Sequence, residues 1–348
     1  MTDSFPTTSG LDALKSPCSS CESSACCWYV PLEYVEVNSY DNLDRLVLAS
    51  CFESLEVGVH SDGRYVIYYA APCRYFEADE KLSCSVYGTG IMPQACRNIR
   101  ARGCWFQANV TNPRGDMIRL SETSLRQIAE LYKFNTDRLV VSKPSWSRIK
   151  RELASSTCEE TLQTYPKDNT QSNFQFPWEE SREGKAQKDE SDLSWDEALG
   201  NPCTGCMAYC CTSFEVTTGT PQTWIDFDRY RYLLQFPNTE VLIRDNGPWV
   251  LSLRSRCSHL TKDNQCGLMD QVTRPRFCVD YNAHSCHFRG RYSDPLQFRV
   301  GYDDFMEISP IFEFNLDGKA VHVPKMMEAC ERVLFMRENA QDASSGGT

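Results

Sequence analysis

Cysteine residues carry the clearest chemistry in this sequence, and they follow one spacing pattern that occurs twice. The first copy contains Cys18, Cys21, Cys26, Cys27, Cys73, Cys84, Cys96 and Cys104. The second copy contains Cys203, Cys206, Cys210, Cys211, Cys257, Cys266, Cys278 and Cys286. The interval from Cys27 to Cys73 is 46 residues, and so is the interval from Cys211 to Cys257. Eight cysteines do not align twice by chance, so the pattern indicates an internal duplication.

Thiolates are strong ligands for Zn²⁺ and for Fe–S clusters, so each cysteine frame predicts a metal centre. Two residues separate Cys203 from Cys206, and this spacing lets both sulfurs bind one ion. The adjacent pair Cys210-Cys211 favours two centres, or one centre and a thiol with another use. All the cysteines of both frames are therefore candidate ligands, and spacing does not fix which of them share a centre. A disulfide framework is the less favoured alternative, because the N-terminus shows no secretion signal.

Other residues with metal-binding side chains do not follow the repeat. Three cysteines fall outside it, and we expect structural or incidental roles for them: Cys51, Cys158 and Cys330. Three histidines lie near the second frame only: His259, His284 and His287. Their first-copy counterparts are Tyr75, Arg102 and Trp105. A ligand that both copies need should occur in both, so we expect surface or supporting roles for these histidines.

The second copy resembles a known family over most of residues 200–290. The resemblance rests on Cys203-x2-Cys206-x3-Cys210-Cys211, Cys257, Cys266-Gly267-Leu268 and Arg274-Pro275-x2-Cys278. This pattern is similar to the CxxCxxCC cysteine-cluster family, the YkgJ-like zinc- or iron-chelating domains, and residues 15–106 resemble it more weakly. The resemblance implies metal chelation by the cysteines. A related cluster occurs in flagellin lysine methylases, which look like Fe–S proteins, so it also implies a [4Fe-4S] or other Fe–S cluster as an alternative cofactor.

The elements that must position the cysteines are predicted to be short and also duplicated. Ser39 is a candidate cap for a helix over residues 40–47, and Asp62-Gly63 predicts a hairpin with a type I′ turn. Both signals recur 184 residues later, at Thr223 and Asn246-Gly247. An amphipathic helix is predicted over residues 121–134. After Cys286 the sequence differs from the first copy and predicts two strands and a helix that begins near Pro324.

These patterns predict an α+β fold made of two small cysteine-rich domains stabilised by metal–thiolate sites. Each domain would contain irregular loops, a short helix and a hairpin. We expect a first domain at 1–150, a polar linker at 151–196 and a second domain at 197–348, with each domain able to fold alone around its own metal.

Net charge and the lack of long apolar segments exclude several classes of partner. The 348 residues carry a net charge of −11 with a pI near 5.1, which argues against nucleic-acid and anionic-membrane partners. No apolar run is long enough to span a membrane, so we expect a cytoplasmic protein. The leading prediction is a zinc- or iron-binding protein whose partners are metal ions, with a protein or peptide as a further candidate partner. The alternatives are an Fe- or Fe–S-dependent enzyme of redox or group-transfer chemistry in peptide or natural-product modification, and a structural zinc scaffold for a protein partner. Whether the chain is an enzyme is left open.

Overall fold

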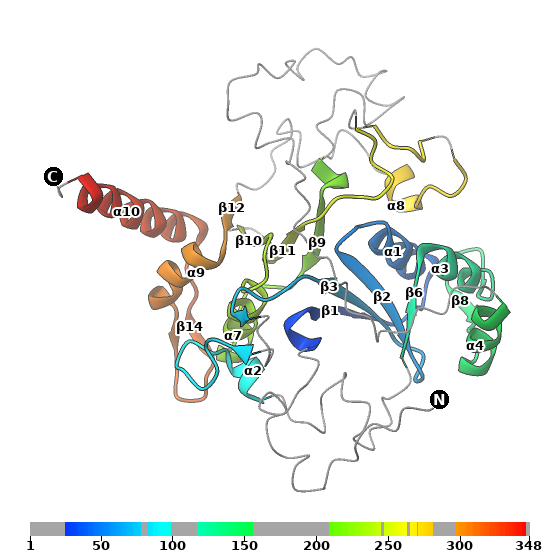
Figure 1. Ribbon diagram of the computed structural model, residues 1–348, viewed down its shortest axis with the longest axis horizontal. Coiled ribbons are helices and arrows are strands. Elements are labelled where there is room, and N and C mark those ends of the chain that lie inside the picture. The colour runs from blue at the N-terminus through cyan, green and yellow to red at the C-terminus, as the bar shows by residue number, and fades with distance from the viewer. Residues whose placement is uncertain are drawn as a thin grey trace, which may run out of the picture.

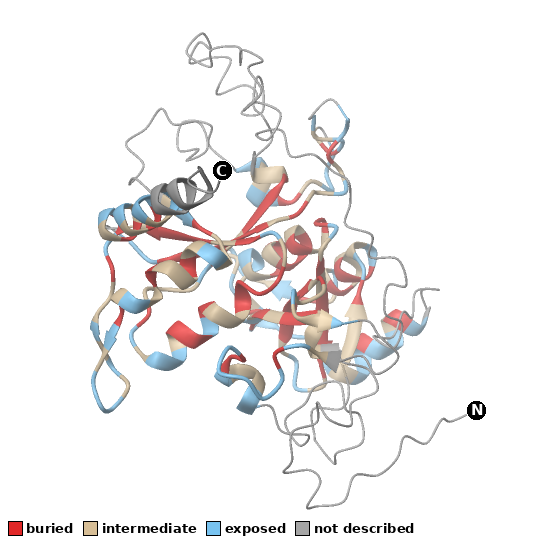
Figure 2. Cartoon of the chain, turned by 60° about the vertical axis from the view of Figure 1, so that its left-hand side comes forward, coloured by how far each residue is buried: buried red, intermediate tan, exposed pale blue. Residues whose placement is uncertain are grey.

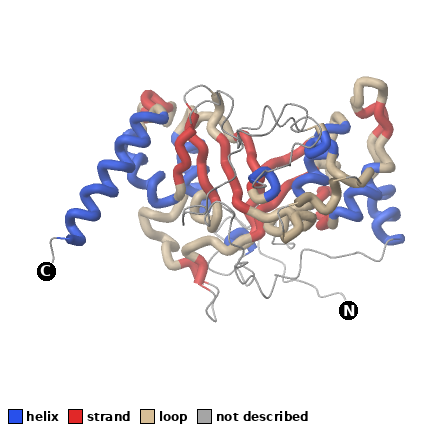
Figure 3. Tube along the Cα trace, turned by 90° about the horizontal axis from the view of Figure 1, so that it is seen from above, coloured by secondary structure: helices blue, strands red, loops and turns tan. Residues whose placement is uncertain are grey.

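The computed structural model describes residues 25–77, 83–98, 117–155, 209–244, 247–262, 265–269, 271–280 and 297–345. Helices and strands are mixed along the chain, as expected for an α+β protein (Figure 1). Figure 3 shows strands in the middle of the molecule and helices toward both ends. Helix α4 (Trp146–Ser155) extends past residue 150, the expected end of the first domain. The rest of the expected linker lies outside the described residues.

The first copy forms a four-stranded antiparallel sheet in the order β1-β3-β2-β6. Its strands are β1 (Tyr29–Val35), β2 (Leu55–His60), β3 (Tyr65–Ala70) and β6 (Met117–Leu120). The second copy forms a sheet of the same topology, in the order β9-β11-β10-β12. Its strands are β9 (Ser213–Thr217), β10 (Thr239–Arg244), β11 (Val250–Arg254) and β12 (Gln297–Val300). The duplication seen in the cysteines is thus also present in the order of the strands.

Residues after the cysteine frames are duplicated too, at a shift of 180. The matched first-copy elements are α3 (Glu122–Ala129), β7 (Lys133–Phe134), β8 (Val140–Ser142) and α4. Their second-copy equivalents are α9 (Tyr302–Ile308), β13 (Glu313–Phe314), β14 (Ala320–His322) and α10 (Met326–Ser345). The prediction that the copies differ after Cys286 was therefore wrong. Few residue types are shared, but the buried positions are, as when Leu125 matches Phe305.

Local signals explain the paired helices and one hairpin. Ser39 caps α1 (Tyr40–Ser50) and Thr223 caps α7 (Trp224–Leu233), each with a reciprocal side-chain bond from the third helical residue. Of the Asp62-Gly63 pair, only Gly63 has a positive φ, at 83°. The Gly63 N–H donates to the carbonyl of His60, so a turn closed by a left-handed glycine replaces the expected type I′ turn. Helix α3 ends at Ala129, earlier than predicted, because β7 follows it.

One hydrophobic cluster runs through both copies. It includes Leu43, Leu46 and Phe52 of the first copy together with Phe214 and Trp249 of the second. Figure 2 shows buried residues on the strands and on the helices that cover them. The rings of Phe52 and Phe214 meet edge to face, with 5.5 Å between their centroids. This packing argues against copies that fold alone.

Candidate metal centre

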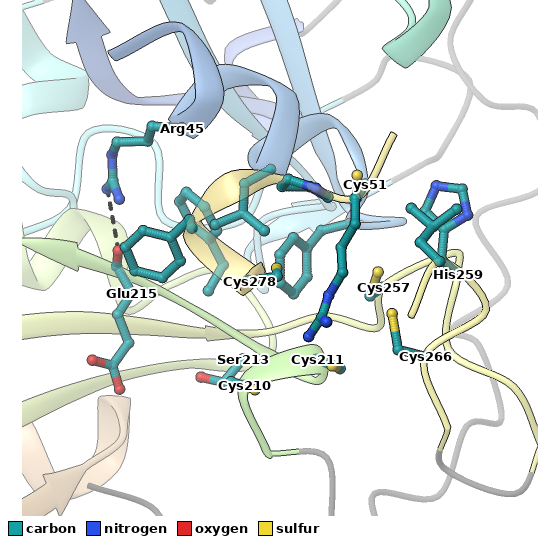
Figure 4. Close-up of a pocket in the computed structure, with 17 residues that line it drawn as sticks. Arg45, Cys51, Cys210, Cys211, Ser213, Glu215, Cys257, His259, Cys266 and Cys278 are labelled. Atoms are coloured by element: carbon teal, nitrogen blue, oxygen red, sulfur yellow. Dashed lines mark hydrogen bonds between the residues drawn. The ribbon is translucent and has the colours of Figure 1, made fainter. Parts of the chain in front are cut away.

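Five cysteines of the second frame line one cavity of about 150 Å³. They are Cys210, Cys211, Cys257, Cys266 and Cys278. They come from separate parts of the chain: the 3₁₀ turn η6 (Tyr209–Cys211), the loop after β11, and the short helix α8 (Arg276–Val279). Figure 4 shows these side chains around the same space. All five are half-buried thiols outside any disulfide, so the predicted second frame is assembled as far as the structure describes it.

Backbone hydrogen bonds hold the distant cysteines of each frame together. The N–H of Cys257 donates to the carbonyl of Cys211 at 2.7 Å. In the first frame the N–H of Cys73 donates to the carbonyl of Cys27, also at 2.7 Å. The second cysteine of each adjacent pair therefore accepts from the cysteine 46 residues later. This explains why that interval is the same in both copies.

The thiols of the second frame lie within electrostatic range of one another. The pKa of Cys257 is raised to about 11, chiefly by burial and in smaller part by the nearby Cys266 sulfur. Burial also raises the pKa of Cys278 to about 12, with contributions from Cys210 and Cys257. For Cys210 the hydrogen bond with Cys211 is the largest cause of a raised pKa, followed by burial. A bound cation would compensate this repulsion and favour the thiolate forms.

The first frame gathers its cysteines around a residue of the second copy, Tyr232. Burial raises the pKa of Tyr232, and the nearby sulfurs raise it further: those of Cys96, Cys26, Cys27 and Cys73. Burial raises the pKa of Cys73 to about 11, with added repulsion from Cys84 and Cys26. Strands β4 (Phe76–Glu77) and β5 (Ser83–Cys84) position Cys84, and α2 (Gln94–Asn98) carries Cys96. Five cysteines therefore converge in this frame too.

Several predicted residues lie outside the described parts of the chain. They are Cys18, Cys21, Cys104, Cys203, Cys206, Cys286, Cys158, His284 and His287. Their roles stay predictions. Cys330 lies in α10 and does not line the cavity.

Each copy holds the cysteine helix of the other. The two carboxylate oxygens of the buried residue Asp44 in α1 accept from the backbone N–H groups of Arg276, at 2.9 Å, and Phe277, at 2.7 Å. These groups begin α8, where N–H donors have no partner within the helix. In the other direction, Asp228 in α7 accepts from the N–H of Ala95 in α2 at 3.0 Å. Asp44 and Asp228 thereby position Cys278 and Cys96.

The sequence contained a signal for these contacts. The dipeptides Asp44-Arg45 and Asp228-Arg229 correspond at the same shift of 184 as the helices. Arg45 donates to the carbonyl of Glu215 in β9, and Arg229 donates to the carbonyl of Leu32 in β1, both at 3.2 Å. An Asp-Arg pair that recurs on an otherwise apolar helix face indicates that both copies use these two side chains for contacts with the rest of the protein.

Three further residues gather beside the second frame. Cys51, Glu122 and His259 each have a ligand atom within 4.8 Å of the others, and Cys51 and His259 line the cavity with the frame. Burial raises the pKa of Cys51, and the Glu122 carboxylate adds to the shift. Burial also raises the pKa of Glu122, but hydrogen bonds from Arg126 and His259 outweigh it and lower the pKa overall. Sequence spacing missed this group because none of its members repeats.

Comparisons with known protein families, with curated proteins and with solved structures found no match. Among the helices that the structure describes, none has the length and apolar character to cross a membrane.

Proposed function

We propose that this protein binds zinc or iron through its two cysteine frames. The observation that carries the proposal is the convergence of five thiols, from segments as far apart as Cys210 and Cys278, on a single cavity. The first frame supports it, because the sulfurs of Cys96, Cys26, Cys27 and Cys73 lie close enough to Tyr232 to raise its pKa.

The five thiols line one cavity, and among the described residues no three of them have sulfurs within 4.8 Å of one another, so a bound centre would draw them together. Burial raises the pKa values of Cys257 and Cys278, and repulsion between neighbouring sulfurs adds to the shift. A soft divalent metal or an Fe–S cluster converts the repulsion into bonds. Both Zn(Cys)₄ and [4Fe-4S] centres need four sulfurs, so each frame has enough thiols for one such centre among its described residues.

The metal decides between the proposals for function. Anaerobic purification of the full chain, followed by elemental analysis, acid-labile sulfide and visible absorption, separates zinc from an Fe–S cluster. An Fe–S cluster gives a brown protein with labile sulfide, whereas Zn(Cys)₄ is colourless. Cys278→Ser should lower the metal content of the second frame and Cys96→Ser that of the first. The matched control Cys330→Ser should leave metal content unchanged, and a chain without stoichiometric metal would refute the proposal.

One observation favours an enzyme over a scaffold. The cavity of the second frame also contains Cys51 and His259, which are not part of the repeat. A purely structural centre needs no such asymmetry. The Fe- or Fe–S-dependent enzyme therefore stays the second candidate function. Variants that remove the Cys51 thiol or the His259 imidazole without lowering the free energy of unfolding would support it.

A further inference from the structure

Cys51, Glu122 and His259 come from three different elements. Cys51 follows the last residue of α1, Glu122 is the first residue of α3, and His259 lies in the loop after Cys257. The first two belong to the first copy and His259 to the second. A thiol, a carboxylate and an imidazole therefore meet where the two copies join, and together they offer the S, O and N ligands that zinc and iron bind.

Their contacts leave ligand atoms facing one another. His259 Nε2 lies 2.7 Å from Glu122 Oε2. The other carboxylate oxygen, Oε1, accepts from Arg126 at 2.6 and 3.0 Å, so Arg126 fixes the carboxylate and leaves Oε2 toward His259. The Cys51 thiol donates to the carbonyl of Val47 at 3.3 Å. Cys51 is buried, while the Glu122 and His259 side chains are 23 % and 29 % exposed, so an ion can reach the group.

The duplicated fold supplies a control within the same molecule. Gln235 stands where Cys51 does, Tyr75 where His259 does, and Tyr302 where Glu122 does. The Tyr75 and Tyr302 hydroxyls lie 3.0 Å apart, which makes the same contact between copies as the His259–Glu122 pair. Gln235 accepts from the Cys73 thiol through Oε1, and its buried Nε2 has no hydrogen-bond partner among the residues that the structure describes.

The comparison distinguishes a metal site from a hydrogen bond that only links the two copies. Two neutral hydroxyls are enough for such a hydrogen bond, as Tyr75 and Tyr302 show. A linking hydrogen bond alone gives no reason for the third position, Cys51, to differ from its counterpart as well. Beside the second frame all three positions carry good metal ligands, and at the equivalent positions beside the first frame all three carry poor ones.

We propose that Cys51, Glu122 and His259 bind one divalent transition-metal ion, Zn²⁺ or Fe²⁺, beside the second cysteine frame, with no equivalent ion beside the first. The ion replaces the proton between Nε2 and Oε2, and these atoms then separate to roughly 3.3 Å, as metal bonds of about 2.0–2.2 Å at tetrahedral angles require. Three protein ligands leave a coordination position open, as in catalytic zinc sites. Because Cys51 and His259 line the cavity, that position is accessible from it. A reactive centre thus lies beside the second frame, and Gln235, Tyr75 and Tyr302 form its structural counterpart beside the first.

This site does not depend on metal in the cysteine frames, so the two proposals fail separately. Zinc is the probe: the full chain is loaded with Zn²⁺, passed over a desalting column, and analysed for zinc per chain. Glu122→Gln, His259→Gln and Cys51→Ser should each hold one equivalent less than the unaltered chain. The matched variants Tyr302→Phe and Tyr75→Phe should hold as much as the unaltered chain.

Glu122→Gln decides the outcome if a bulkier change unfolds the chain, because its amide keeps hydrogen bonds to Arg126 and His259 while losing the charge. If the folded Glu122→Gln protein binds as much zinc per chain as the unaltered protein, the proposed metal site is wrong, and the three residues only form hydrogen bonds between the copies. Loss of an equivalent in Tyr302→Phe would overturn the asymmetry. A chain whose frames hold no zinc should still lose its one equivalent in Glu122→Gln.

Discussion

The carboxylate of Asp44 accepts a hydrogen bond of 2.7 Å from the backbone N–H of Phe277, the residue before Cys278. Asp228 accepts from Ala95, the residue before Cys96. The relationship is reciprocal, so each copy supplies the cap of the cysteine helix in the other. The packing of the two copies therefore holds the cysteine helices of both frames in place.

Removal of this cap should destabilise the chain and its second frame together. Asp44→Ala removes the acceptor of two partly buried N–H groups at the start of α8, and a loss of about 1–2 kcal/mol in the free energy of unfolding is expected. Urea unfolding measures the loss, and elemental analysis should show less metal in the second frame. Asp41→Ala is the control, because Asp41 lies in the same helix with a side chain 75 % exposed. Equal midpoints for the two variants would show that the cap is dispensable.

The shared core predicts that neither copy folds alone. Residues 1–155 and 197–348, expressed separately, should each lack a cooperative thermal transition, because each exposes the apolar surface that packs on the other. Mixing the two fragments should restore the transition and near-UV circular dichroism. Independent cooperative unfolding of either fragment would support two autonomous domains, as the sequence first suggested.

Phe52 and Phe214 test the contact between the copies at a single point. Each is buried, so Phe52→Ala or Phe214→Ala should cost about 3–5 kcal/mol. A double-mutant cycle should show coupling of about 0.5–1.5 kcal/mol, since the rings meet edge to face. Phe335→Ala serves as the control because Phe335 is 56 % exposed. Strict additivity of the two core variants would mean that the rings do not meet in solution.

Metal removal should loosen the frames without unfolding the sheets. Strands β3 and β11 are buried by apolar side chains of both copies, so their packing needs no metal. After chelation we expect far-UV circular dichroism to be largely retained while proteolysis becomes faster in the loop from 255 to 280. Collapse of the far-UV signal on chelation would instead show that metal supplies most of the folding free energy, as the sequence alone had indicated.

The duplicated cysteine spacing was visible in the sequence, and an interval such as Cys27 to Cys73 reflects a backbone contact that both copies keep. Caps were equally visible, since Ser39 and Thr223 act through residues only three positions away. Such signals are local or repeated. They need no knowledge of how the two copies pack.

The reciprocal packing was not predictable from local patterns. The match between α3 and α9 survives in buried positions, such as Leu125 and Phe305, while the two helices share few residue types. Cys51 was assigned an incidental role because its counterpart is not a cysteine. That reasoning finds features that both copies share and overlooks one that a single copy has acquired. Only the fold brings Glu122 of one copy beside His259 of the other.

The most direct test of metal binding by the cysteines is X-ray absorption at the edge of whichever metal the anaerobically purified full chain contains. Bound thiolates should give a sulfur shell at about 2.3 Å from zinc. The sulfur amplitude should fall in Cys257→Ser and stay the same in Cys330→Ser. A spectrum with only nitrogen and oxygen neighbours, or a sulfur shell that Cys257→Ser leaves intact, would contradict binding at the cavity of the second frame.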